Sequence, residues 1–161
     1  NELCMDHIYT PWRRDYMQSS KKSGCIFCHA LEASDQESLI IVRGKLSFII
    51  LNRYPYTNGH LMVVPYQHAS TLEELDADTR CEMMELLNSS LVVLKEVYHP
   101  DGFNLGGNIG AAAGAGVADH IHLHVLPRWM GDTNFMTSVS GTRILPETVE
   151  ESWRRIRDAW K

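Results

Sequence analysis

Three histidines alternate with apolar residues in the run His120-Ile121-His122-Leu123-His124. On a β-strand successive side chains point to opposite faces, so the three imidazoles are expected to project together while the residues between them face a core. Such a row gains nothing for folding, because each buried imidazole needs a hydrogen-bond partner and a solvated face would more naturally carry Thr, Lys or Glu. The run therefore indicates metal binding or nucleophilic chemistry, since a neutral imidazole can do either near neutral pH.

A glycine- and alanine-rich loop leads directly into this run, from Gly110 to Gly116. Glycine lets backbone N–H groups approach phosphate oxygens closely, although taken alone the loop is equally typical of a flexible connector. It is not a dinucleotide-binding fingerprint, because its glycine spacing differs and it precedes a predicted strand. It is not a P-loop either, because it lacks Gly-Lys-Ser/Thr. Its place beside three histidines favours a role in phosphate binding.

Cys25 and Cys28 form a C-x-x-C pair. The spacing suits a tetrahedral zinc site if two further ligands exist, and the alternatives are a redox pair and two buried thiols. A thioredoxin-like pair is expected near a βαβ pattern, which is not found here. Cys4 and Cys81 have no evident partner, and Cys81 is predicted to pack on the apolar stripe of a helix.

Five segments are predicted as strands. Residues 39–43 and 46–52 are rich in β-formers, with a hairpin turn at Gly44-Lys45 between them. The other predicted strands are His60–Pro65, Phe103–Asn108 and His120–Leu126. Residues 1–24 show no clean period and are expected to form an irregular arm packed on the domain.

Two helices complete the pattern. The first is signalled by a capping box at Ser70 and Glu73, with Asp76 as a second possible cap, and it ends at Pro100. Its apolar residues recur at helical spacing: Cys81, Met84, Leu87, Leu91 and Leu94. The second helix is predicted to carry Pro146 in its first turn and the stripe Val149, Trp153, Ile156 and Trp160. Hairpin strands with segregated helices predict an α+β fold, formed by residues 1–161 as a single domain with an antiparallel sheet.

Composition narrows the function. The formal net charge of -5 argues against a general nucleic-acid binder, although a small anionic substrate can still find a locally positive site. No apolar run is long enough for a membrane helix, and the first residues lack the pattern of a signal peptide. The default expectation is a cytoplasmic protein that does not associate with membranes.

Several motifs together resemble the histidine-triad (HIT) superfamily. His120 to Arg128 is similar to the family signature, and Pro55 to His68 is similar to its second motif. Further segments resemble the branch of bacterial diadenosine tetraphosphate phosphorylases and fragile-histidine-triad-like proteins: Pro11-Trp12-Arg13, Cys25 to Cys28, Gly114 to Asp119 and Gly131 to Met136. The resemblance spans nearly the whole chain and implies the HIT-like fold, with one long helix and a C-terminal helix.

The resemblance implies roles for particular residues. His122 is the nucleophile that attacks a nucleotide α-phosphate, His124 contacts that phosphate and helps the leaving group, and His60 supports both. Asn52 falls where the family places a ribose-binding residue. Asn108, or alternatively Asn104, falls where a side chain contacts phosphate. Gly114 and Gly116 belong to the loop expected to bind the nucleotide, and Gly116 stands where many members carry glutamine, so backbone N–H groups or another side chain must replace that contact.

The resemblance also implies a zinc ion held by Cys25, Cys28, His68 and His120, and a homodimer that pairs through the long helix and a sheet edge. In that case His120 is structural. Three functions stay open: cleavage of dinucleoside polyphosphates by water or phosphate, cleavage of nucleoside phosphoramidates or other nucleotide conjugates, and non-catalytic nucleotide binding. An intact His122 favours the enzymes, and the glycine-containing motifs of the branch favour dinucleoside polyphosphates.

Overall fold

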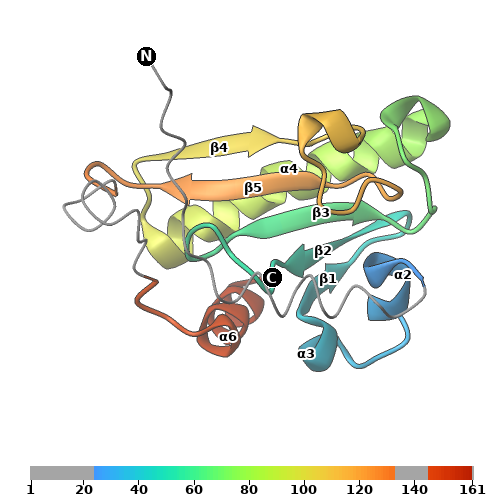
Figure 1. Cartoon of the computed structure of the whole chain (residues 1–161). Helices are drawn as coiled ribbons and strands as arrows, with labels where there is room; N and C mark the ends of the chain where they lie inside the picture. Colours follow the sequence, from blue (N-terminus) through green and yellow to red (C-terminus); the bar gives the residue numbers. More distant parts are fainter. Residues whose placement is uncertain (1–23, 133–144, 161) are drawn as a thin grey trace, which may run out of the picture.

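The structure is a computed structural model that describes residues 24–132 and 145–160 (Figure 1). Its centre is a five-stranded antiparallel sheet in the order β1-β2-β3-β5-β4, which confirms the predicted α+β architecture. The strands are β1 (Ile40–Arg43), β2 (Ser47–Leu51), β3 (Leu61–Pro65), β4 (Gly102–Gly106) and β5 (Leu123–Arg128). The predicted arm, apart from Gly24, and residues 133–136 of the Gly131–Met136 motif lie outside the described residues. No helix within the described ranges is long and apolar enough to cross a membrane.

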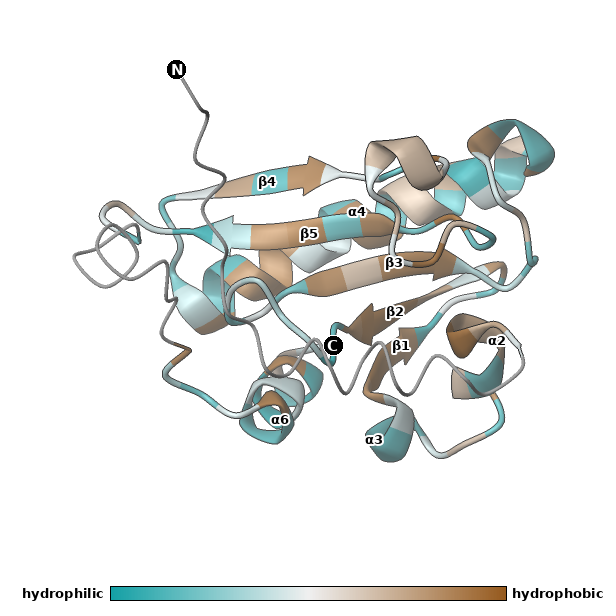
Figure 2. Ribbon diagram, in the orientation of Figure 1, coloured by the Kyte–Doolittle hydropathy of each residue, from teal (hydrophilic) through white to brown (hydrophobic). Residues whose placement is uncertain are grey.

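The core lies against the middle of the sheet. Every residue of β2 and β3 is buried, and these strands are strongly apolar in Figure 2. The long helix α4 (Ala77–Tyr98) covers one face of the sheet, behind the strands in Figure 1. A Cβ on Gly59 would point at Leu94 and Tyr98 of α4. His60, the next residue, places its ring beside His124 of β5.

The sequence predicted the start and the buried face of α4 only partly correctly. Asp76 is the N-cap, with its carboxylate accepting from the Thr79 N–H at 2.6 Å. The predicted capping box is wrong, because Ser70 bonds Glu74 instead of Glu73 and precedes a short 3₁₀ turn (Leu72–Glu74). Cys81 is exposed, so its predicted packing role is also wrong. The buried residues of the helix are Thr79, Met83, Leu87, Ser90, Val93 and Leu94.

Among the described residues, three further helices flank the sheet: α2 (Ile26–Ala30), α3 (Asp35–Ser38) and α6 (Val149–Ala159). Helix α2 contains the second cysteine of the C-x-x-C motif and α3 follows it, and neither helix was predicted. Helix α6 has Thr148 as its N-cap, in a capping box with Glu151, so Pro146 lies before the helix and not in its first turn as predicted. Ile156 is buried as expected, and the Trp153 indole N–H donates to the Ile40 carbonyl at 2.9 Å, which fixes α6 beside β1.

The predicted strand His120–Leu126 is shifted in the structure, because β5 begins only at Leu123. Its register against β3 pairs Val63 with Leu123, so a longer ladder would place Pro65 opposite Ile121. Proline has no N–H to donate, and the Ile121 N–H instead donates to the Ala69 carbonyl at 2.7 Å. His120 and His122 therefore precede the strand, and strand alternation alone does not set their directions.

Candidate active site and metal site

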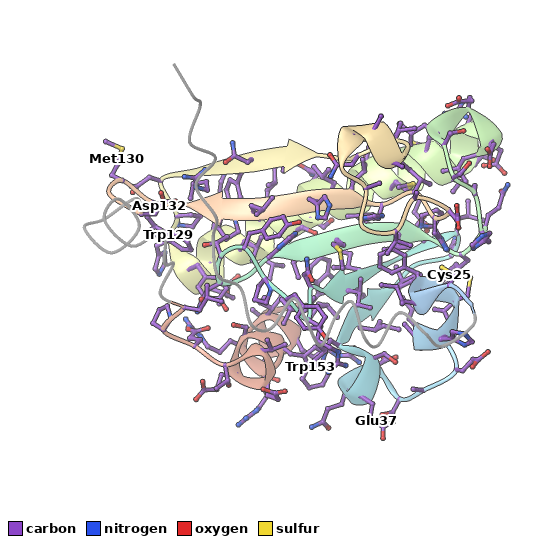
Figure 3. The ribbon with its side chains drawn as sticks, in the orientation of Figure 1. Cys25, Glu37, Trp129, Met130, Asp132 and Trp153 are labelled. Atoms are coloured by element: carbon purple, nitrogen blue, oxygen red, sulfur yellow. The ribbon has the colours of Figure 1, made fainter. Side chains whose placement is uncertain are left out.

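Cys25, Cys28, His68 and His120 converge at one end of the sheet. Cys25 is the N-cap of α2 and Cys28 lies within that helix, whereas His68 follows β3 and His120 precedes β5. Figure 3 shows Cys25 at this end, far from Trp129, Met130 and Asp132 at the other end of β5. One ligand atom from each of the four residues lies within 4.8 Å of the other three. The structure thus brings together the four residues that the resemblance implied.

The geometry of this group fits a tetrahedral zinc ion. Bond lengths of about 2.0–2.3 Å place neighbouring ligands of such an ion about 3.3–3.8 Å apart. The His120 Nδ1 lies 3.2 Å from the Cys25 Sγ and 3.8 Å from the Cys28 Sγ, and the His68 Nδ1 lies 3.4 Å from the Cys28 Sγ. The His120 Nε2–H donates to the Pro65 carbonyl at 2.9 Å, which leaves Nδ1 as the ligating nitrogen.

His122 is buried beside this metal site and is held in one tautomer. Its Nδ1 lies 2.9 Å from the His120 carbonyl oxygen, which can only accept, so Nδ1 carries the proton and Nε2 keeps its lone pair. The ring packs 4.9 Å from the Phe27 ring of α2. A Cβ on Gly107 would lie 2.9 Å from the His122 carbonyl oxygen, so the end of β4 approaches the His122 backbone closely. An imidazole with a free, oriented Nε2 is a competent nucleophile.

His60 and His124 form a hydrogen-bonded pair next to His122. The His60 Nε2 lies 2.8 Å from the His124 Nδ1, and the His122 and His124 ring centroids are 4.8 Å apart. The Tyr56 N–H donates to the His60 Nδ1 at 3.2 Å, and the Asn52 side-chain nitrogen lies 3.3 Å from the same atom. The His60 Nδ1 is therefore an acceptor, its Nε2–H donates to His124, and the Nε2–H of His124 remains available to a substrate.

Burial keeps these imidazoles neutral. Burial lowers the pKa of His60 to about 3, with the neighbouring His124 and His122 adding to the effect. Burial and then His122 lower the pKa of His124 to about 4. The pKa of His122 is also lowered by burial, against the opposing effect of its bond to the His120 carbonyl. At pH 7 the three groups are thus neutral, so His122 keeps the lone pair that a nucleophile requires, while His124 still has one N–H to donate.

The glycine- and alanine-rich loop contains a short 3₁₀ turn (Ala111–Ala113) between Gly110 and Gly114, which both have positive φ. Gly116 follows in the same loop. The two asparagine candidates are separated by the register of β4 and β5, in which Gly106 pairs with His124. Asn108 lies two residues beyond this pair, immediately after the Gly107 contact with His122. The Asn104 side-chain oxygen accepts from Arg128 at 2.6 Å, further along β5.

Sequence reasoning missed two side chains that shape this site. Phe27 lies inside the C-x-x-C motif, and its ring also contacts His120 with a centroid distance of 5.4 Å. Tyr56 has its ring centroid 4.7 Å from that of His60. Nothing in the sequence marks Tyr56 as a site residue. Phe27 could have been found from its place between the two cysteines of the C-x-x-C pair.

The HIT domain family model matches residues 33–130, which is more than half of the chain. With the histidines and the sheet in place, the match identifies this chain as a member of the HIT domain family.

Named relatives agree with this assignment. The chain is 38% identical over 165 residues to the AP-4-A phosphorylase of Mycobacterium tuberculosis (strain H37Rv), covering 97% of this chain and 85% of that protein. It is 31% identical over 113 residues to the adenylylsulfatase HINT3 of Arabidopsis thaliana, covering 68% and 55%. The crystal structure of a Zn-bound histidine triad family protein from Mycobacterium smegmatis has a TM-score of 0.68 and 32% identity, covering 85% of this chain and 93% of that one.

Proposed function

We propose that this protein is a nucleotidyl hydrolase or transferase that cleaves dinucleoside polyphosphates, such as diadenosine tetraphosphate, at an α-phosphate. The observation that carries the proposal is the bond between the His122 Nδ1 and the His120 carbonyl, which leaves the His122 Nε2 free to attack. The identity of 38% to an AP-4-A phosphorylase over nearly the whole chain supports this substrate class. The neutral state of His122 supports the same chemistry, because a protonated imidazole has no lone pair.

The reaction proceeds by double displacement. The His122 Nε2 forms a bond to the α-phosphorus as the bond to the bridging oxygen breaks, and the remaining nucleoside polyphosphate leaves. The nucleotidylated ring is cationic while Nδ1 keeps its proton, and the His120 carbonyl dipole stabilises this charge. Water then displaces His122 to give AMP, or inorganic phosphate displaces it to give ADP, and the neutral imidazole is restored.

The neighbouring histidines supply hydrogen bonds to the reacting phosphate. The His124 Nε2–H donates to the α-phosphate or to the leaving oxygen, where negative charge grows as the bond breaks. His60 orients His124 through the 2.8 Å contact described above. Asn52, beside His60, is assigned to the ribose. Asn108 and the backbone of Gly114 and Gly116 are assigned to the phosphates. They belong to the segment that follows Gly107, whose backbone lies close to that of His122.

Zinc is proposed as a structural ion held by Cys25, Cys28, His68 and His120. When bound, it supplies a cross-link among α2, the segment after β3 and the segment before β5, and no Lewis-acid step. The zinc-bound Mycobacterium smegmatis relative supports this assignment.

A homodimer is proposed on the surface formed by α4 and the edge strand β4. Val92 and Met84 of α4 and Leu105 of β4 are exposed although apolar. Burial of such side chains against a second copy would remove apolar surface from water. Light scattering after gel filtration tests this, and a Val92→Glu variant is expected to shift the mass to that of a monomer.

Product analysis tests the activity directly. The protein is incubated with diadenosine tetraphosphate, with and without phosphate. ADP and ATP formed only with phosphate identify a phosphorylase, whereas AMP and ATP formed without phosphate identify a hydrolase. Adenosine 5′-phosphoramidate is the comparison substrate, because a relative from Schizosaccharomyces pombe, 28% identical over 104 residues, bears the name adenosine 5′-monophosphoramidase. Turnover of the phosphoramidate alone would refute the proposed substrate class.

The nucleophile is tested by His122→Ala. Turnover is expected to fall to background while nucleotide binding, followed by equilibrium dialysis, survives. His99→Asn is the control, because His99 is exposed at the end of α4 and asparagine tolerates its positive φ. Normal turnover by His122→Ala would refute the mechanism.

A further inference from the structure

A tyrosine at the end of α4 supports the loop that carries His60. A Cβ built on Gly59 would lie 2.9 Å from the Tyr98 Cε2 and 3.1 Å from the Leu94 Cδ2, so the backbone of this residue is in close contact with the tyrosine ring. Gly59 has a φ of +74°, a conformation that glycine adopts without strain. The next residue is His60, whose carbonyl accepts from the Asn52 N–H at 2.9 Å.

Tyr98 is itself fixed by α6 and the segment before it. Its hydroxyl donates to Glu147 at 2.8 Å, and the same carboxylate oxygen accepts from the Ser152 hydroxyl at 3.0 Å. Arg155 forms an ion pair with Glu147 and places its guanidinium 4.8 Å from the centre of the Tyr98 ring. The Trp129 indole N–H donates to the Tyr98 carbonyl at 3.3 Å. Tyr98 is therefore held both through its side chain and through its backbone carbonyl.

A pocket borders the loop beside this contact. The pocket is lined by Pro55, Asn58 and Gly59 of the loop and by Glu147, Thr148 and Ser152. A loop that borders such a space depends more strongly on the contacts it does make. The loop also carries Tyr56, whose N–H donates to the His60 Nδ1, so a movement of the loop moves a hydrogen bond that orients His60.

We propose that Tyr98 is a positioning residue that sets the His60–His124 pair through Gly59. The proposal rests on the proposed function, in which His124 donates a hydrogen bond to the leaving oxygen. Loss of the ring would let the loop shift toward the space left behind. The His124 Nε2–H would then be misaligned with the leaving oxygen, whereas His122, held by the His120 carbonyl, would keep its place. A misplacement of about 1 Å in such a group costs about 100-fold in rate.

The test measures how the rate depends on the leaving group. A series of 5′-AMP aryl esters is used, with phenols that span a range of acidity. A hydrogen bond to the leaving oxygen matters most for the least acidic phenols, because more charge develops on their oxygen. For Tyr98→Ala we expect a steeper dependence of log kcat on the phenol pKa. The ester of the least acidic phenol should slow about 10- to 100-fold, while that of the most acidic phenol changes little.

Two controls separate positioning from stability. Tyr98→Phe keeps the ring against Gly59 and is expected to keep the slope of the parent. Trp153→Ala removes a comparable aromatic side chain from α6, on the side that faces β1 (Figure 3). If it lowers rates at all, it should lower every ester by one common factor. A common factor for Tyr98→Ala as well would overturn the proposal.

A second variant and a second readout cover a Tyr98→Ala chain that does not fold. Gly59→Ala pushes a methyl group toward the same ring and is expected to steepen the slope in the same direction. The hydrogen-bonded His60 Nε2–H proton, followed by NMR, is expected to shift in Gly59→Ala and stay in place in Trp153→Ala. An unchanged slope and an unchanged proton resonance would refute the positioning role. If the parent cleaves neither the esters nor diadenosine tetraphosphate, the proposed function itself fails.

Discussion

The buried His60–His124 pair is expected to make the protein sensitive to acid. A histidine in the unfolded chain titrates near 6.5, whereas burial lowers the pKa of His60 to about 3 and that of His124 to about 4 in the folded protein. Between these values the unfolded chain binds more protons than the folded one. The free energy of unfolding therefore falls as the pH falls below about 6.5, and the stabilisation is fully present only above that value.

The size of the effect follows from the shift of His60, which is fully buried. Each pH unit between the two pKa values costs about 1.4 kcal/mol, so lowering the pH from 6.5 to 4 costs about 3 kcal/mol through His60 alone. This is a large part of the roughly 5–15 kcal/mol that stabilises an ordinary domain. His124 adds a loss of the same sign over the same range.

Urea unfolding between pH 7 and pH 4 measures this loss. The parent is expected to lose about 3 kcal/mol more than His60→Asn over that range, because the asparagine does not titrate. His99→Asn is the matched control, since His99 is exposed and has a φ of 46°, which asparagine tolerates. Acid release of zinc is common to the three proteins and cancels in the differences. Parallel curves for the parent and His60→Asn would refute the assignment of a neutral, buried His60.

Four further substitutions are expected to change zinc binding or the free energy of unfolding by different amounts. His68→Ala should abolish stoichiometric zinc binding, measured by elemental analysis, and should remove about 3 kcal/mol of stability at a free zinc concentration 100 times Kd; unchanged metal content would contradict the site. Met83→Ala should cost about 2–5 kcal/mol in chemical unfolding because Met83 is buried on α4, whereas Cys81→Ala should stay within about 0.5 kcal/mol because Cys81 is exposed. Asp76→Ala should lower the free energy of unfolding through the lost N-cap bond to the Thr79 N–H, and an unchanged urea midpoint would contradict the role of this cap.

Local signals in the sequence determined most of the elements. Two segments rich in β-formers and the Gly44-Lys45 turn predicted β1 and β2, and the Asp76 cap with Pro100 bounded α4 closely. The sequence also indicated that His122 and the C-x-x-C pair are functional residues, because residue type and spacing can be read without knowledge of the fold. The face of α4 that is buried was not determined, because Met83 and Met84 are equally apolar and only the sheet selects between them.

The family resemblance implied different roles for the histidines, but only the tertiary structure supplies the physical reason for them. The run of three predicted a single row, but Pro65 ends the ladder and lets His120 turn its side chain to the cysteines while its carbonyl fixes the tautomer of His122. The pairing of His60 with His124 joins residues far apart in the chain, and their low pKa values come from burial that no local pattern encodes. The physical reason is that hydrogen-bond partners and desolvation are properties of the packed chain, whereas propensity and spacing are properties of neighbours in sequence.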